Sequence, residues 1–301
     1  MSPHLDLSKH PRLLIGCEEL QRLKQSPSVP CLRDAQDMLA RRADTELGSY
    51  GHNTHLGRAR RMQGRVLSLI FRWHQTGAER YRNAAVESVR TMGDWDTWSW
   101  IAWRAGESEP EAIFDLSYGE NSATLALAWD LLHPELDEKE KKDFVNIARK
   151  WCFGPGLIHC RPDGMDWFAK KDSNWNTVCA GGLGILCLAM YEETEETRDL
   201  LPLVEESIKP FFHLTEKTDG GWPEGIGYWN YGMLYGFRYL LSHERATGES
   251  HPLLQLDGVR KTLSFPLDFC PCGDACSFAD GNSCRPFPFH DAAAERLGRS
   301  A

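Results

Sequence analysis

Residues 172–184 read DSNWNTVCAGGLG, and an apolar run from Ile185 to Met190 follows directly. Asn174 and Asn176 flank Trp175 where a helix is expected to begin, because asparagine is favoured at helix N-caps. The small residues that follow allow the backbone of such a helix to approach its neighbours closely. The stretch therefore predicts a central helix with polar side chains at its start.

A second stretch, residues 219–232, reads DGGWPEGIGYWNYG. It places Glu224 in a glycine-rich loop, where glycines permit unusual backbone angles. Tyr228, Tyr231 and Tyr235 follow at spacings of three and four, so they are expected to share one face of a helix. We expect the two stretches to line one cleft.

Apolar residues recur at helical spacing through most of the chain. From Leu56 to Gln75 they form one face, and Thr76-Gly77 is typical of a glycine C-cap. The same pattern predicts further helices at 18–24, 81–92, 118–132, 138–151, 178–191, 197–215 and 231–247, with a break at Pro210 and Asp137 as an N-cap.

The predicted helices come in pairs. Pairs end near Gly77, Leu132, Glu192 and Gly248, a period of roughly 55–60 residues that is typical of repeated helical hairpins. Few segments alternate with period two, so no substantial sheet is expected. We predict one all-α domain over residues 1–301, an (α/α) toroid of helical hairpins that is incomplete, because residues 278–301 do not supply a clear sixth pair.

The charge balance limits the classes of partner. The chain has 34 basic and 43 acidic residues, a net charge of −9, which argues against nucleic-acid binding. An anionic substrate would need a local basic lining. No apolar run of about 18 residues is present, so no membrane span is expected. Residues 1–10 lack a signal-peptide pattern, which favours the cytoplasm, or the periplasm or secretion if a signal has been trimmed.

Ten cysteines are present, and those in helical surroundings, such as Cys152 and Cys179, are expected to act as small hydrophobic residues. A cluster near the end has spacings that match no common structural zinc site: Cys270, Cys272, Cys276 and Cys284. We therefore predict no metal and no cofactor.

Several side chains have both a structural and a chemical interpretation. Asn174 and Asn176 are helix caps or amides that bind a substrate carboxylate. Trp175 and Trp222 are core residues or platforms on which a sugar stacks. Glu224 is a solvated loop acid or, if buried near a second carboxylate, a protonated one.

Tyr228 and Tyr231 are core residues or phenols that point into a cleft and act as acid and base. Arg58, Arg61 and Arg65 form a solvated face or a positive wall for an anionic polymer. His52 and His55, just before that helix, are each a base or a neighbour of the helix cap.

Taken together, these motifs resemble the heparinase II/III-type polysaccharide lyases. The resemblance rests on residues 174–176 with 179–182, on residues 221–225 with 228–232, on HPRLL at 10–14, and on LAWDLL at 127–132. It covers most of residues 10–285. Members of that family have an α/α toroid followed by β-sandwich domains, which this chain is too short to contain.

The resemblance implies cleavage of a uronate-containing polysaccharide by β-elimination. It assigns Asn174 (or Asn176) and Glu224 to neutralise the uronate carboxylate, and Tyr231 (or Tyr228) to act as acid and base. Asn176, Trp175, Trp222, Arg58 and Arg61 are the residues expected to bind the anionic polysaccharide. The sequence departs from the family at one position, because Trp175 stands where several such lyases have histidine.

Two other functions remain open from the residues alone. A glycoside hydrolase on the same kind of fold would need two carboxyl groups, for which Asp115, Asp166, Asp172 and Glu224 are available. A carbohydrate-binding or scaffold module without catalysis would need neither the carboxyl groups of a hydrolase nor the acid and base of a lyase. An elimination product with a double bond distinguishes the lyase from both.

Overall fold

The computed structural model describes residues 9–25, 27–48, 55–161, 173–269 and 288–298, and every regular element in these ranges is a helix. The prediction of an all-α protein is confirmed. The longer α-helices are α2 (Pro30–Glu46), α3 (His55–Thr76), α4 (Glu79–Gly93), α6 (Leu116–Leu132), α7 (Glu138–Ala148), α10 (Asn174–Ala189), α11 (Glu196–Lys217) and α12 (Ile226–Thr247). The shorter ones are α1 (Cys17–Arg22), α5 (Trp100–Ala105), α8 (Gly154–His159), α13 (Asp257–Lys261), α14 (Phe265–Phe269) and α15 (Phe289–Arg296).

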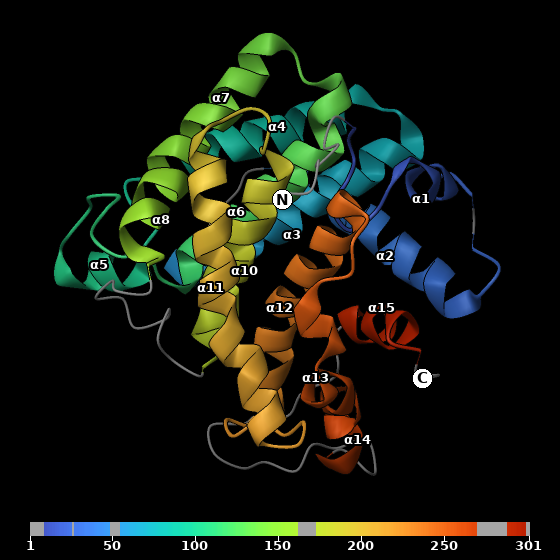
Figure 1. Ribbon diagram of the computed structural model, residues 1–301. Helices are drawn as coiled ribbons and strands as arrows, with labels where there is room; N and C mark the ends of the chain where they lie inside the picture. The colour runs from blue at the N-terminus through green and yellow to red at the C-terminus, as the bar shows by residue number, and fades with distance from the viewer. Residues whose placement is uncertain (1–8, 26, 49–54, 162–172, 270–287, 299–301) are drawn as a thin grey trace.

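Four helices, α3, α6, α10 and α12, run parallel to one another and are called the inner helices here. In α3 and α6, Arg60 contacts Glu120 near the two N-terminal ends, and His74 contacts Leu131 near the two C-terminal ends, so these helices run in the same direction. Figure 1 shows α10 and α12 side by side in the middle of the molecule. Because they are parallel, the inner helices all begin at the same rim.

Helices α6 and α10 pack at backbone contact. A Cβ atom placed on Gly182 would lie 2.1 Å from the carbonyl oxygen of Gly119, and one on Gly119 would lie 2.2 Å from that of Val178. Both helices are buried almost throughout, so apolar and small residues surround them on all sides. The small residues of the opening stretch therefore set the spacing of the two central helices.

The return helices α4, α7 and α11 pack outside the inner ones and complete the hairpins. Asp137 caps α7 with a full capping box, and Gly77 and Gly248 adopt positive φ after α3 and α12, as the sequence predicts. Whether the hairpins form a toroid stays a prediction.

Four details of the fold differ from the predictions. The expected break at Pro210 is wrong, because α11 continues through Pro202 and Pro210. The N-cap of α10 is Ser173, so Asn174 is its first helical residue rather than a cap. The short helix α5 and the helix α2 were not predicted.

The N-terminal segment is tied to the central helices by Asp130 of α6. Its carboxylate accepts hydrogen bonds from the backbone N–H groups of Arg12 and Leu13 at 2.9–3.1 Å and lies 2.7 Å from His10 Nδ1. Arg12 then reaches the end of α10, where it donates to the Ala189 carbonyl and to Glu192. One carboxylate thus fixes the beginning of the described chain against two inner helices.

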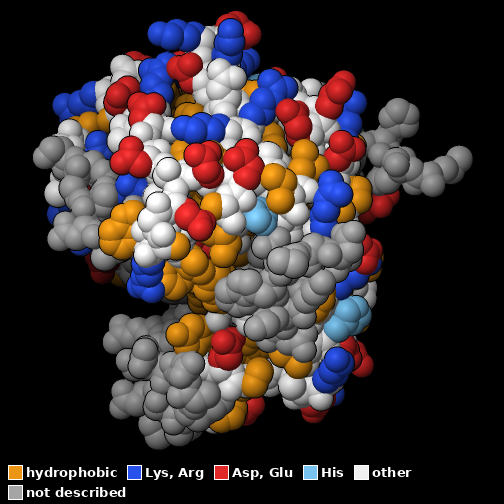
Figure 2. Space-filling view, turned by 90° about the vertical axis from the view of Figure 1, so that its left-hand side faces the viewer, with side chains coloured by type: hydrophobic (Ala, Val, Ile, Leu, Met, Phe, Trp, Pro, Cys, Tyr) orange, Lys and Arg blue, Asp and Glu red, His pale blue; other side chains and the backbone are white. Residues whose placement is uncertain are grey.

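Figure 2 shows the face that carries α5, α7 and α8, with charged side chains over its upper part and hydrophobic ones across its middle. Trp103 of α5 and Ile158 of α8 are about half exposed. Among the helices in the described ranges, none is both long and apolar enough to cross a membrane.

Candidate active site

Three charged and polar side chains meet at the rim where the inner helices begin. Tyr231 of α12 donates its phenol proton in a hydrogen bond to Oε1 of Glu120 on α6. Arg60 of α3 donates from Nε to the same oxygen at 2.9 Å, and its guanidinium lies 5.2 Å from the Tyr231 ring centroid. Three inner helices therefore contribute one residue each to what we call the rim cluster.

Burial dominates the electrostatics of the rim cluster. It raises the pKa of Glu120 above its ordinary value, while the nearby Arg60 opposes that shift. Burial and the neighbouring Glu120 charge raise the pKa of Tyr231 far above its ordinary value, so this phenol is protonated at neutral pH. Burial disfavours the Arg60 charge too, but the attraction of Glu120 and Tyr231 outweighs it and raises the pKa of Arg60.

A second polar layer lies behind the rim cluster. Gln63 of α3 donates to the Tyr235 hydroxyl at 3.4 Å and accepts from Arg238 of α12 at 3.3 Å. The rings of Tyr231 and Tyr235 meet edge to face, with centroids 5.7 Å apart. Polar side chains thus occupy the space between α3 and α12, and the Tyr235 ring packs against Tyr231.

Asn174 and Glu224 form a contact of their own at the start of α10. The Asn174 side-chain nitrogen donates to Glu224 Oε2 at 3.2 Å, and its backbone N–H approaches the same oxygen at 3.5 Å. Ser173 provides no side-chain cap, so Glu224 acts as the acceptor at this helix N-terminus, where negative charge is favourable. Asn174 Oδ1 is buried and has no donor among the described residues.

The two predicted motifs do meet in space. Thr177 of α10 donates to the carbonyl of Gly232 at 2.8 Å, and a Cβ on Gly232 would lie 3.2 Å from that of Asn174. Gly232 directly follows Tyr231 in α12. Asn174 and Tyr231 therefore lie at the starts of neighbouring parallel helices, on one rim of the molecule.

Two of the substrate-binding candidates, Asn176 and Trp222, are buried. Asn176 is fully buried and donates to the carbonyl of Ser207 on α11, so it is not at a surface that a polysaccharide reaches. Trp222 is 2% exposed, and its ring packs 4.4 Å from that of Phe211, so it is a core residue although it borders a surface hollow.

Trp175 and Tyr228 are accessible. Trp175 is partly exposed, and its ring lies 6.1 Å from that of Trp100 on α5. Tyr228 is 37% exposed in the first turn of α12. Their proposed roles as a sugar platform and a second phenol stay predictions.

The predicted strip of solvated arginines is wrong at two of its three positions. Arg58 is buried, donates to the carbonyl of Thr97, and lies 3.9 Å over the Trp95 ring. Arg65 is buried and donates to Ser88 and to the carbonyl of Glu46. Only Arg61 is exposed, so a positive wall built from these arginines is not present.

Of the four carboxyl groups considered for hydrolysis, the structure describes Asp115 and Glu224. Asp115 is fully buried and caps α5 and α6, accepting from Ser99, Trp100, Ile101 and Ser117. Asp166, Asp172 and His52 lie outside the described residues, as do Cys270, Cys272, Cys276 and Cys284, and His55 is described only as the first residue of α3. In the described ranges, no group of three metal-ligating side chains is present.

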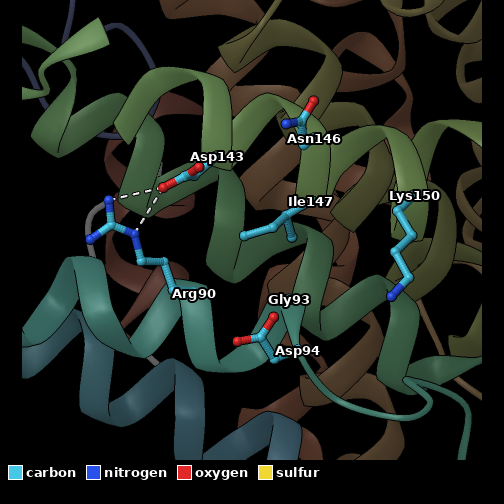
Figure 3. A pocket seen from close by; sticks show the side chains of 7 residues that line it. All are labelled: Arg90, Gly93, Asp94, Asp143, Asn146, Ile147 and Lys150. Atoms are coloured by element: carbon cyan, nitrogen blue, oxygen red, sulfur yellow. Dashed lines mark hydrogen bonds and ion pairs between the residues drawn. The ribbon is translucent and has the colours of Figure 1, made fainter. Parts of the chain in front are cut away.

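A separate hollow of about 400 Å³ lies between α4 and α7 (Figure 3). Arg90 of α4 pairs with Asp143 of α7 across it at 2.9 Å, while Asp94 and Lys150 stand at its other side. It contains none of the residues predicted from the motifs. It is therefore distinct from the rim where Asn174 and Tyr231 lie.

Sequence reasoning missed Arg60 and Glu120. Arg60 lies among the arginines at 58, 61 and 65, and nothing in its spacing distinguishes it from them. Glu120 is the only acidic residue between Leu116 and Ala128, in an otherwise apolar and small-residue helix. An isolated charge in a buried helix was the available signal, because such charges are rarely buried without a partner.

Comparison of the chain with models of known protein families gives no match. Comparison with curated proteins gives none either.

Proposed function

We propose that this chain is a polysaccharide lyase, or the helical domain of one, that cleaves a uronate-containing polymer by β-elimination. The observation that carries the proposal is the phenol of Tyr231, held by Glu120 and Arg60 at the rim where Asn174 begins the next helix. An acid, a proton acceptor and a cation within one cluster are the groups that elimination next to a carboxylate requires.

The rim cluster supports a balanced reaction. In one concerted step, Tyr231 passes its proton to Glu120 while its oxygen takes the proton from C5 of the uronate, and Arg60 stabilises the negative charge that develops on the Tyr231 oxygen. The electron pair left at C5 forms the C4–C5 double bond as the C4–O bond breaks. The re-formed phenol gives the abstracted proton to the leaving oxygen, and Glu120 returns its proton to Tyr231.

The positions of the inner helices also support an anionic substrate. Four parallel helices present their N-terminal ends to one rim, and each end carries a partial positive charge. Arg60 and Arg238 add two full positive charges close to the buried carboxylate of Glu120, while Asp115 and Glu224 accept hydrogen bonds at the starts of α6 and α10. Arg60 and Arg238 thus support binding of a polyanion on the α3 and α12 side of the rim by a chain whose net charge is −9.

The test is incubation with a panel of uronate polymers, followed by the ultraviolet absorbance of the conjugated double bond. We expect the wild-type chain to produce it and Tyr231→Phe to lose about 100-fold or more in kcat, because the phenol supplies both proton transfers. Tyr191→Phe is the matched control, since Tyr191 follows the far end of α10. Cleavage without a double bond would establish hydrolysis instead, and binding without cleavage would establish a carbohydrate-binding module.

A further inference from the structure

Arg60 differs from the other arginines at the start of α3. Its side chain is 53% exposed, whereas its partner Glu120 is 2% exposed. The guanidinium lies against the Tyr231 ring with one of its five N–H donors, that of Nε, directed to Glu120. The buried carboxylate of Glu120 therefore holds Nε of Arg60, while the rest of the Arg60 guanidinium faces solvent.

The other predicted carboxylate binders are occupied. Asn174 donates its amide to Glu224, and Glu224 is itself an acceptor at the start of α10. Glu224 thus brings a second anion to the place where a substrate carboxylate was expected to bind. Arg60, in contrast, pairs with no carboxylate other than Glu120 in the described ranges.

We propose that Arg60 binds the carboxylate of the sugar unit whose bond is cleaved, and thereby restricts the substrate to uronates. This inference rests on the proposed lyase function and names the substrate-recognising residue of that same site. In a uronate, C5 carries the carboxylate and is bonded to C4, which carries the leaving oxygen. A group that binds the carboxylate must therefore lie within a few ångströms of the phenol that protonates that oxygen.

The rim cluster meets this requirement. The Arg60 guanidinium carbon lies 5.2 Å from the centroid of the Tyr231 ring. Guanidinium matches carboxylate in two parallel hydrogen bonds, which fixes the orientation of the sugar as well as its charge. The same contact stabilises the negative charge that moves onto the carboxylate oxygens when C5 loses its proton.

The experiment compares two substrates, a polyuronate and its methyl ester, in which the carboxylate is replaced by a neutral group. We expect Arg60→Gln to lower kcat/KM on the polyuronate at least tenfold more than on the ester, because the lost stabilisation of the Tyr231 oxygen affects both substrates and the lost carboxylate contact affects only the polyuronate. Arg60→Lys is expected to recover part of the loss, since it keeps the charge but not the paired geometry. Arg41→Gln, at an exposed position of α2, is the control for loss of one positive charge.

Equal losses on both substrates would overturn the inference, because they would mean that Arg60 acts only on Tyr231 or on the fold and not on the substrate carboxylate. Unchanged activity on the polyuronate would overturn it as well. Titration of an oligouronate onto Tyr231→Phe, with and without Arg60→Gln, separates the two proposals. If Arg60→Gln weakens binding at least tenfold in this titration, Arg60 is supported as the carboxylate binder. If the wild-type chain at the same time yields no unsaturated product, the lyase function is rejected.

Discussion

Glu120 is a carboxylate that the protein buries while giving it two different partners. Tyr231 and Arg60 both donate to its Oε1, and the arginine is half exposed. A buried charge with a partly solvated partner contributes little net stability, because its desolvation offsets the attraction. Under the proposed function, the arrangement serves proton transfer to and from Tyr231 rather than stabilisation of the fold.

Glu120→Gln is expected to change stability and activity in opposite directions. The pKa of Glu120 is raised in the folded state because burial disfavours its charge, so ionised Glu120 destabilises the fold at neutral pH, and its removal should raise the free energy of unfolding. Activity should fall about 100-fold, because the phenol loses its proton acceptor. Urea unfolding at pH 7 and the rate of double-bond formation measure the two effects.

The pH dependence of the rate provides a check on the same residue. Wild-type activity should fall as pH drops through the raised pKa of Glu120, and this acid limb should disappear in Glu120→Gln. Glu138→Gln, at a position 94% exposed on α7, should leave the free energy of unfolding and the rate of double-bond formation unchanged. Loss of both stability and activity in Glu120→Gln would contradict the proton-acceptor role.

Which residues lie at the rim was only partly predictable from the sequence. Asn174 and Tyr231 were singled out because glycine and aromatic residues surround them, and the structure brings their helices together. Arg60 was not separated from Arg58, because both belong to one run of arginines and only tertiary packing buries Arg58 under Trp95. Local pattern identifies a helix face, but the face of a neighbouring helix determines which charges meet.

At the scale of elements, the helix periods and caps predicted most of the hairpins. Helices α3 and α4 follow the predicted spacing, and Gly77 and Gly248 end their helices as expected. Pro210 did not break α11, because the following Phe211 and Phe212 are core residues whose packing outweighs the lost backbone hydrogen bond. The Asn176 amide donates to the carbonyl of Ser207 one turn before that proline.

Gly182→Ala is expected to lower the free energy of unfolding by about 3 kcal/mol. The added methyl group would lie 2.1 Å from the Gly119 carbonyl oxygen, so α6 and α10 must separate. Gly64→Ala is the matched control, because the nearest atoms to its methyl group belong to the end of the Arg42 side chain, which can move.

In the control, alanine in a helix interior should be neutral or stabilise by up to about 1 kcal/mol. Chemical denaturation measures both variants. Equal effects of the two substitutions would show that the contact between α6 and α10 is not tightly packed.

For the whole molecule, the N-terminal segment is expected to contribute strongly to stability through Asp130. Asp130→Ala removes the acceptor for the backbone N–H groups of Arg12 and Leu13, so the free energy of unfolding should fall by about 3 kcal/mol. Asp143→Ala, which removes a partly exposed pair with Arg90, should cost no more than about 1 kcal/mol. Urea unfolding of both variants measures the difference, and similar losses would show that the N-terminal segment is only loosely attached.

The Arg12 contacts have a consequence for biosynthesis. Arg12 bonds to Ala189 and Glu192, which are translated about 180 residues later. Arg12 is therefore synthesised before its final partners, and it lacks them until α6 and then α10 have followed. Since domains fold as they emerge, the hydrogen bonds of Arg12 to Ala189 and Glu192 form late, after α6 and α10 have already packed together.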